Sequence, residues 1–201
     1  MKETGLIFKA PMVRAILEGR KTQTRRVAKE FVGRKDLDNI LRRFPKQRGG
    51  QYGEPGDRIY VRETWQVAGG NSGIWYAATD SKTDEGNSPV TNWRPSTHMP
   101  KELARIWLEI TGVRVERLQD ISESDCLVEG IVPWYSGDQT VYMLGPGDTS
   151  GAFGRAGSWK PKRTPKEAFR TLWESTGGDW DANPWVWAID FKVLSTTGLP
   201  A

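Results

Sequence analysis

The sequence of 201 residues predicts a single α+β domain with short helices flanking a curved sheet or a small bulged β-barrel. Several runs alternate apolar and polar residues between glycines and prolines, which is typical of strands. In the run from 104 to 117 this alternation changes parity at Gly112. The apolar positions before it are Ile106, Leu108 and Ile110, and those after it are Val113 and Val115. Such a change predicts a β-bulge, and a bulged strand bends its sheet.

Helices are predicted where capping residues precede an apolar stripe. Residues 9–19 have Pro11 in the first turn and Gly19 in the position of a left-handed cap. Ser122 and Asp125 resemble a capping box for a helix that ends at Glu129 and Gly130, and residues 164–167 form a full box for a helix that stops at 177–178. A further short helix is expected near 36–43.

Strands are expected at 22–27, 58–65, 74–78, 104–117 and 185–193. The run 58–65 places Ile59, Val61 and Trp65 on one face, whereas the last strand points its alternate large residues inward from Trp185 to Val193. Residues 132–163 contain six glycines with little periodicity and are expected to form a long loop.

Composition excludes several classes of protein. No apolar run approaches the roughly 18 residues that span a bilayer, and the first residues lack the features of a secretory signal. With Cys126 as its one cysteine the chain forms no internal disulfide, which favours a cytoplasmic location. One cysteine and one histidine (His98) exclude a structural zinc site, and no clustered carboxylate motif is present. We expect neither a metal nor a cofactor, and no membrane partner.

Charge is unevenly distributed along the chain. Residues 14–48 hold 12 lysines and arginines against four acids, whereas the remaining residues are net acidic. Such a segment is typical of a protein that binds a nucleotide or a polyanion, although a solvated basic face is the simpler explanation. Ten tryptophans could stack bases or fill the core of a small β-fold.

Residues 18–26 read E-G-R-K-T-Q-T-R-R. The spacing excludes a Walker A phosphate loop, because no glycine stands at the required distance before Gly19. A serine–histidine pair at Ser96 and His98 is also excluded, since the two lie close together in a loop bounded by prolines.

Lys21 and Thr24 can face one cavity if Lys21 still belongs to the turn after Gly19, because residues three apart on a strand point to opposite faces. A lysine desolvated among cations has a lowered pKa and can act as a base or a nucleophile beside a threonine hydroxyl. Glu129 is expected in the last turn of its helix, where the helix dipole favours a protonated carboxyl. A plain basic turn is the alternative.

Several motifs occur in the order found in one protein superfamily. These are I-L-E-G-R-K-T-Q-T-R-R (16–26), G-D-R-I-Y-V-R-E-T-W (56–65), W-R-P-S-T-H-M-P (93–100), V-R-V-E-R-L-Q-D-I (113–121) and N-P-W-V-W (183–187). Together they resemble the ASCH superfamily, which has the PUA-like fold, and in particular a branch encoded by phages and prophages. Relative to smaller members, the segments 66–103 and 132–163 are loop insertions.

Characterised relatives include amidohydrolases that remove the acyl group from N4-acetylcytidine and similar N4-acylcytosines. The resemblance implies that Lys21, Thr24 and Glu129 are catalytic, with Lys21 as base and Thr24 as nucleophile or with these two roles exchanged. It also implies an oxyanion donor (Arg26, Arg62 or a backbone N–H) and an aromatic that stacks the base. The residues expected to bind substrate are Arg20, Arg26, Tyr60, Arg62, Glu63, Trp65, Trp93, Ser96 and His98.

The sequence thus predicts a metal-independent amidohydrolase acting on N4-acylated cytosine nucleosides or nucleotides. Two alternatives use the same residues differently. One is a non-catalytic module that binds RNA or a modified nucleotide through the basic segment and the tryptophans. The other is a ribonuclease built on the same pocket.

Overall fold

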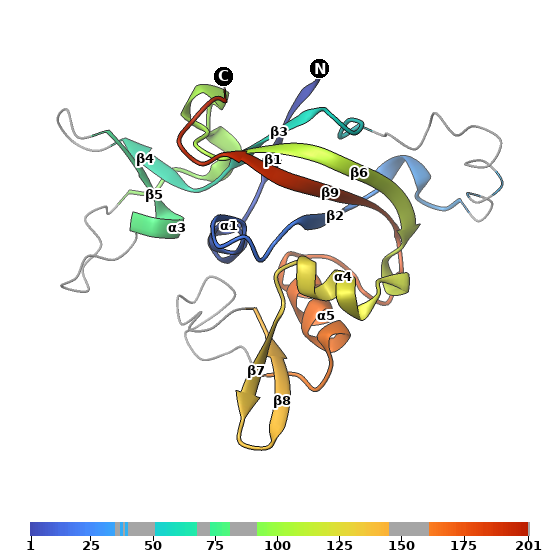
Figure 1. The fold of residues 1–201 in the computed structure, drawn as a ribbon. Helices are drawn as coiled ribbons and strands as arrows, with labels where there is room; N and C mark the ends of the chain where they lie inside the picture. The colour runs from blue at the N-terminus through green and yellow to red at the C-terminus, as the bar shows by residue number, and fades with distance from the viewer. Residues whose placement is uncertain are drawn as a thin grey trace.

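The computed structural model describes residues 1–34, 37, 39, 51–67, 73–80, 92–144 and 161–200. Its main sheet has five strands in the order β1-β3-β6-β9-β2. These strands are β1 (Glu3–Ile7), β2 (Gln23–Val27), β3 (Arg58–Arg62), β6 (Trp107–Arg117) and β9 (Trp185–Ser195). The β1–β3 pair is parallel and the other pairs are antiparallel. Figure 1 shows β6 and β9 curving together along the length of the sheet.

The bend in the sheet coincides with the predicted bulge. The β6–β9 register shifts between Ile110 and Gly112, and a second irregularity lies between Trp107 and Leu108. Gly112 stands opposite Asp190, and a Cβ at this glycine would lie 2.9 Å from Asp190 Oδ2. The absence of a side chain therefore lets the bulged strand approach β9 closely. The predicted α+β class, with a bulged sheet and short flanking helices, is confirmed.

Four α-helices accompany the sheet in the described residues: α1 (Ala10–Leu17), α3 (Ala77–Asp80), α4 (Glu123–Val128) and α5 (Pro165–Ser175). Figure 1 shows α4 and α5 together on the concave side of the curved sheet. The α5 helix has a complete capping box between Thr164 and Glu167. For α4, the hydroxyl of Ser122 accepts the backbone N–H of Asp125 at 3.0 Å. The helix expected near 36–43 lies largely outside the described residues, of which Leu37 and Asn39 are helical.

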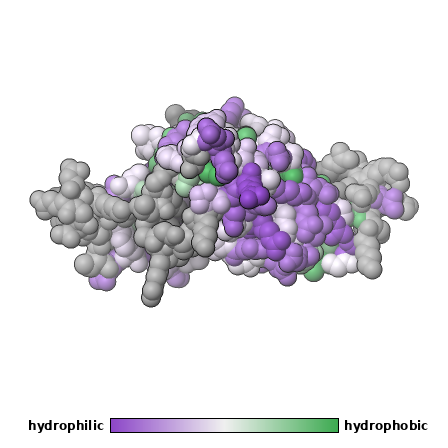
Figure 2. Space-filling model, turned by 90° about the horizontal axis from the view of Figure 1, so that it is seen from below, coloured by the Kyte–Doolittle hydropathy of each residue, from purple (hydrophilic) through white to green (hydrophobic). Residues whose placement is uncertain are grey.

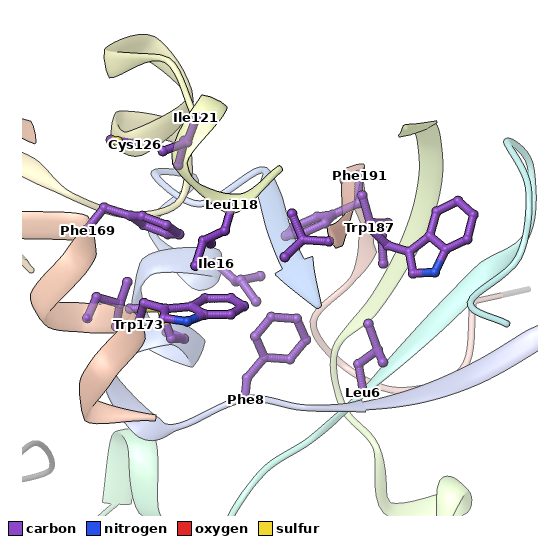
Figure 3. Close-up of a cluster of buried hydrophobic side chains, with 14 of the residues drawn as sticks. Leu6, Phe8, Ile16, Leu118, Ile121, Cys126, Phe169, Trp173, Trp187 and Phe191 are labelled. Atoms are coloured by element: carbon purple, nitrogen blue, oxygen red, sulfur yellow. The ribbon is translucent and has the colours of Figure 1, made fainter. Parts of the chain in front are cut away.

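The core lies between the sheet and the helices. It combines the apolar stripe of α1, the predicted stripe of α5 and the strands β3, β6 and β9. Figure 3 shows side chains from β1, α1, α5 and β9 meeting in this core. The β9 strand is buried on both faces near its start, since Val186 and Ala188 are as inaccessible as Trp187. Val193, which the alternation placed inward, is exposed.

Three predictions about strands need correction. The run 58–65 divides after Arg62, because Trp65 begins a separate strand, β4 (Trp65–Val67), that pairs with β5 (Ile74–Tyr76). Residues 132–163 are not one loop: β7 (Val132–Ser136) and β8 (Gln139–Met143) form a hairpin there, and residues 145–160 lie outside the description. Gly137 makes the turn at a φ of 60°, so a glycine counted as loop composition closes a hairpin. The edge strand β1 was not predicted.

Short 3₁₀ helices connect several of these elements: η1 (Lys29–Phe31), η3 (Ser96–His98), η4 (Lys101–Leu103) and η5 (Leu118–Asp120). None of the helices in the described part of the chain combines the length and apolarity that a membrane crossing requires. The face shown in Figure 2 is predominantly hydrophilic, with apolar residues scattered over it.

Candidate functional site

The segment that carries Lys21 is a turn clamped between two helices. After α1 the chain reverses at Gly19, whose φ is +72°, and the backbone N–H groups of Arg20 and Lys21 both donate to the carbonyl of Ala15 at 2.9 and 3.0 Å. The N–H of Thr22 then donates to the carbonyl of Val128 at the end of α4 at 2.9 Å. These bonds fix the turn against the helix that carries Glu129.

The Lys21 ammonium is buried and has an acceptor for each of its three N–H groups. Its side chain is 2% exposed, and Nζ donates to Glu129 Oε2 at 2.5 Å, to the Gln23 carbonyl at 2.6 Å and to the Glu129 carbonyl at 2.9 Å. Burial lowers the pKa of Lys21, the Glu129 carboxylate opposes this shift, and Arg26 and Arg25 add to it. The buried ammonium and the Glu129 carboxylate are therefore in direct hydrogen-bonding contact.

Glu129 occupies the C-cap of α4 and is held by two cations. Its Oε2 accepts from Lys21, and its Oε1 accepts from Arg25 Nη1 at 3.1 Å. Arg25 is completely buried and also pairs with Glu116 at 2.6 Å and with Asp125 at 2.9 Å. The unfavourable position of Glu129 at a helix C-terminus is thus offset by two positive charges.

A pocket of about 560 Å³ opens beside this pair. Lys21, Thr24 and Glu129 all line it. The β2 strand begins at Gln23, so Lys21 precedes the strand and Thr24 lies on it, opposite Ile189 of β9. This is the arrangement in which residues three apart reach the same cavity.

Apolar side chains make up much of the pocket lining. They come from the end of β1, the residue after it, α1, the end of β2 and α5: Ile7, Phe8, Met12, Val27, Phe169, Leu172 and Trp173. Figure 3 shows Phe169 and Trp173 of α5 together with Phe8, which follows β1, in the same cluster. An apolar wall facing a few charged groups is typical of a site for a small organic ligand.

Arg26 also lines the pocket, on the same side of β2 as Thr24. Its Nη2 donates to the carbonyl of Ile7 at 2.6 Å, and its guanidinium lies 5.0 Å from the centre of the Phe8 ring. Its buried Nε has no hydrogen-bond partner in the described residues. Burial lowers the pKa of Arg26, whereas Glu129 and Tyr52 raise it.

The remaining predicted binding residues do not line this pocket. Arg20 forms an ion pair with Glu18 at 2.5 Å and donates to the carbonyl of Gly130 at 3.3 Å. Arg62 donates to the carbonyl of Thr97, away from the pocket. Their expected contacts with substrate remain predictions.

The other predicted aromatic and polar residues lie around the β4–β5 sheet or the segment beside it. Trp65 is buried there, with Tyr60 packed against the same cluster. Glu63 is buried and paired with Arg105. Trp93 is partly exposed just before the bridge between Trp65 and Arg94, and η3 carries the partly exposed Ser96 and the exposed His98. The structure therefore gathers four predicted residues at the pocket (Lys21, Thr24, Arg26 and Glu129) and places the others elsewhere.

Sequence reasoning missed Arg25 and the aromatic residues of the pocket. Arg25 lines the pocket and binds the second oxygen of Glu129, and the only signal for it in the sequence was its place in the basic run at 18–26. Phe8 carried no signal, because β1 was not predicted. Phe169 and Trp173 were correctly expected on the apolar stripe of α5, and their position beside Lys21 depends on how that helix packs. In the described ranges no three His, Cys, Asp or Glu side chains form a group suited to a metal.

Two solved structures are similar to this chain over most of its length. One is the crystal structure of an ASCH domain from Lactobacillus crispatus, which is 14% identical in sequence. The alignment covers 96% of this chain and 79% of the ASCH domain chain, with a TM-score of 0.39. A DUF984 protein from Enterococcus faecalis is 11% identical, covers 97% of this chain and 81% of its own, and has a TM-score of 0.38. No protein-family model and no curated protein matches the sequence significantly.

Proposed function

We propose that this chain is an amidohydrolase that removes the acyl group from N4-acylated cytosine nucleosides or nucleotides. The observation that carries the proposal is the buried Lys21–Glu129 pair, with Nζ and Oε2 2.5 Å apart, on the wall of a pocket that Thr24 also lines. Perturbed ionisable groups beside a nucleophile in a concave site are the usual elements of such an activity.

The reaction begins with the transfer of a proton from Lys21 to Glu129 Oε2, which leaves the amine neutral. Neutral Lys21 then turns its lone pair to Thr24 and takes the hydroxyl proton as the oxygen attacks the acyl carbonyl carbon. The tetrahedral intermediate collapses with cleavage of the C–N bond, and the exocyclic amine leaves with a proton from Lys21 or Glu129. Water, deprotonated by the same pair, attacks the acyl-threonine ester. The ester C–O bond breaks, the Thr24 oxygen takes that proton back from the pair, and the carboxylic acid is released.

Lys21 is better placed as the base than as the nucleophile. Its nitrogen is surrounded by three acceptors, two of them backbone carbonyls, so attack on a carbonyl would require the loss of several hydrogen bonds. Thr24 has no hydrogen bond from its hydroxyl to the described residues and lines the pocket directly. This geometry supports Thr24 as the attacking group.

The pocket itself supplies the remaining contacts of the proposal. Phe8, Phe169 and Trp173 offer an apolar surface for a pyrimidine ring. Of the two arginines considered as oxyanion donors, Arg62 lies away from the pocket, which leaves a backbone N–H or Arg26.

The test is hydrolysis of N4-acetylcytidine by the purified protein, followed as cytidine release by absorbance in the presence of EDTA. Lys21→Ala, Glu129→Gln and Thr24→Val should each lose about 10²- to 10⁴-fold in turnover, as expected for groups engaged in proton transfer or attack. Arg170→Gln is the matched control, because Arg170 pairs with Glu174 on the exposed face of α5. No turnover by the wild type over a series of acyl sizes would refute the proposal.

A non-catalytic module for RNA or a modified nucleotide is the second candidate. The observation that favours it is the complete hydrogen bonding of the Lys21 ammonium, which suits a structural ion pair as well as a base. This candidate predicts RNA binding that weakens steeply as salt increases, with no turnover. Conversion of intact single strands into fragments would instead indicate a ribonuclease.

A further inference from the structure

We propose that the pocket binds its substrate as a phosphorylated nucleoside, with the phosphate held by the Arg26 guanidinium and by Lys29 at the rim. The inference rests on the proposed function for the identity of the base, whereas the phosphate subsite follows from the charges of the pocket. The chemistry of deacylation would allow either a free nucleoside or a mononucleotide as substrate. A phosphate subsite favours the mononucleotide.

The charges that line the pocket are strongly unequal. Five cationic side chains face Glu129 alone: Lys9, Lys21, Arg25, Arg26 and Lys29. Lys21 and Arg25 are neutralised, the first by Glu129 and the second by Glu129, Glu116 and Asp125. Lys9 donates to the carbonyl of Ser175 at 2.9 Å. Arg26 and Lys29 have no ion pair with a carboxylate of the described residues, so their positive charges remain available to an anion.

Arg26 is the more informative of the two. A guanidinium carries five N–H donors, and one bond, from Nη2 to the carbonyl of Ile7, accounts for its hydrogen bonding to the described residues. The nearby Glu129 carboxylate acts electrostatically on Arg26 but is already paired with Lys21 and Arg25. A largely desolvated cation without an ion pair of its own is costly unless a ligand supplies the opposite charge. The Phe8 ring 5.0 Å away covers one face of the group and fixes its plane. A fixed planar fork with free donors is the geometry that recognises a phosphate by two parallel hydrogen bonds.

Lys29 adds a point charge on the same side of the pocket. It begins η1, is exposed, and lines the pocket with Arg26. The neighbouring carboxylate, Glu30, accepts the indole N–H of Trp187 at 2.7 Å and does not line the pocket. The anion subsite is therefore not already neutralised by the segment that carries Lys29.

The size and the two-sided lining favour a mononucleotide over a strand of RNA. A pocket of about 560 Å³ lies within the range of sites that enclose one small ligand. Its apolar wall of Phe8, Phe169 and Trp173 suits a base, and its cationic side suits a phosphate. Both parts of a single nucleotide are accommodated within one cavity.

The experiment compares N4-acetylcytidine with its 5′-monophosphate as substrates for the wild type, Arg26→Gln, Arg26→Lys, Lys29→Gln and the control Arg170→Gln. We expect kcat/KM of the wild type to be about tenfold or more higher for the nucleotide, because charged hydrogen bonds are strong in a desolvated site. Arg26→Gln should remove this preference through KM, Arg26→Lys should retain part of it, and Lys29→Gln should reduce it by a few-fold. Direct binding of CMP and cytidine, measured calorimetrically, completes the comparison.

The outcomes separate this inference from the proposed function. If N4-acetylcytidine is hydrolysed as efficiently as its monophosphate, the phosphate subsite is refuted while the hydrolase remains. If neither substrate is hydrolysed but CMP binds more tightly than cytidine in an Arg26-dependent manner, the subsite stands and the hydrolase fails. An equal loss of kcat on both substrates in Arg26→Gln, with the preference retained, would assign Arg26 to the oxyanion and overturn the inference. Binding of RNA oligonucleotides without binding of CMP would overturn it as well.

Discussion

Two buried ion pairs in this chain have similar composition and different surroundings. Lys21 and Glu129 join the turn after α1 to the end of α4, and Arg105 and Glu63 join the two segments that flank the β4–β5 sheet. In both pairs the carboxylate is almost inaccessible. Burial shifts a pKa in each pair, lowering that of Lys21 and raising that of Glu63.

In the Arg105–Glu63 pair the guanidinium binds both oxygens of the carboxylate. Arg105 donates from Nε and Nη2 to the two oxygens of Glu63 at 2.9 and 3.0 Å, and from Nη1 to the hydroxyl of Thr79 at 3.1 Å. The Tyr76 ring covers the guanidinium at 4.0 Å. Such bidentate geometry binds both carboxylate oxygens of Glu63 to one cation.

The Lys21–Glu129 pair differs in two ways. It borders a pocket, and its cation is an ammonium that contacts one carboxylate oxygen of Glu129 at short distance. An ammonium loses its proton more readily than a guanidinium, and burial lowers the pKa of Lys21 further. The comparison shows that a buried charge does not by itself mark a functional site. The accessible cavity and the exchangeable proton distinguish the two regions.

The largest expected effect is a difference in hydrolytic activity between variants of the two ion pairs. Lys21→Met should reduce hydrolysis of N4-acetylcytidine by about 10³-fold or more, since it removes the proposed base. Arg105→Met should leave the turnover of the folded protein close to that of the wild type. Steady-state rates, normalised to the folded fraction from circular dichroism, measure the difference. Comparable losses in the two variants would contradict the distinction.

The next largest effect is a difference in the free energy of unfolding between variants of the two ion pairs. Arg105→Met leaves Glu63 buried without its partner and should lower the free energy of unfolding by about 3–5 kcal/mol. Lys21→Met should cost less, because Arg25 still pairs with Glu129 at 3.1 Å. Urea unfolding monitored by tryptophan fluorescence gives both values. A larger loss in Lys21→Met would show that its pair is the main structural support.

A smaller effect concerns pH. The pKa of Lys21 lies below its ordinary value of 10.5 in the folded chain, so the unfolded chain binds more protons at this residue between the two values. The cost of burying the charged lysine is therefore full below the folded pKa and disappears as the pH rises through 10.5. The stability of the wild type relative to Lys21→Met should increase over that window. Denaturant midpoints of both proteins between neutral and alkaline pH test this, and a flat difference would argue against the lowered pKa.

The smallest effect is expected at Cys126, which lies in the core on α4 close to the Lys21–Glu129 pair. Burial raises the pKa of its thiol to about 12, so the thiolate is scarce at neutral pH. A disulfide reagent such as DTNB should label the native protein only slowly and the urea-unfolded protein fully. Rapid labelling of native protein would indicate that α4 opens readily.

Local patterns determined much of the fold in advance. The bulge at Gly112 followed from a change of parity, and α5 followed from a capping box with an apolar stripe, because both depend on residues close in sequence. The β7–β8 hairpin was missed although its partners are adjacent in sequence, because its glycine was counted as loop composition. The strand break after Arg62 was missed because the change of sheet at Trp65 depends on its pairing with β5. The helix predicted near 36–43 and the segment 145–160 remain outside the described residues.

The sequence by itself identified Lys21, Thr24 and Glu129 as residues suited to proton transfer, from their types, the turn at Gly19 and the motif resemblance. Only the tertiary structure decided that Lys21 and Glu129, 108 positions apart, meet at 2.5 Å and that Arg25 holds the second carboxylate oxygen. It also decided that Phe8, Phe169 and Trp173 line the same pocket, while Glu63 and Trp65 lie elsewhere. The physical reason is that a pocket is made by elements packing across the fold, and periodicity along one element specifies which face is buried but not which distant element covers it.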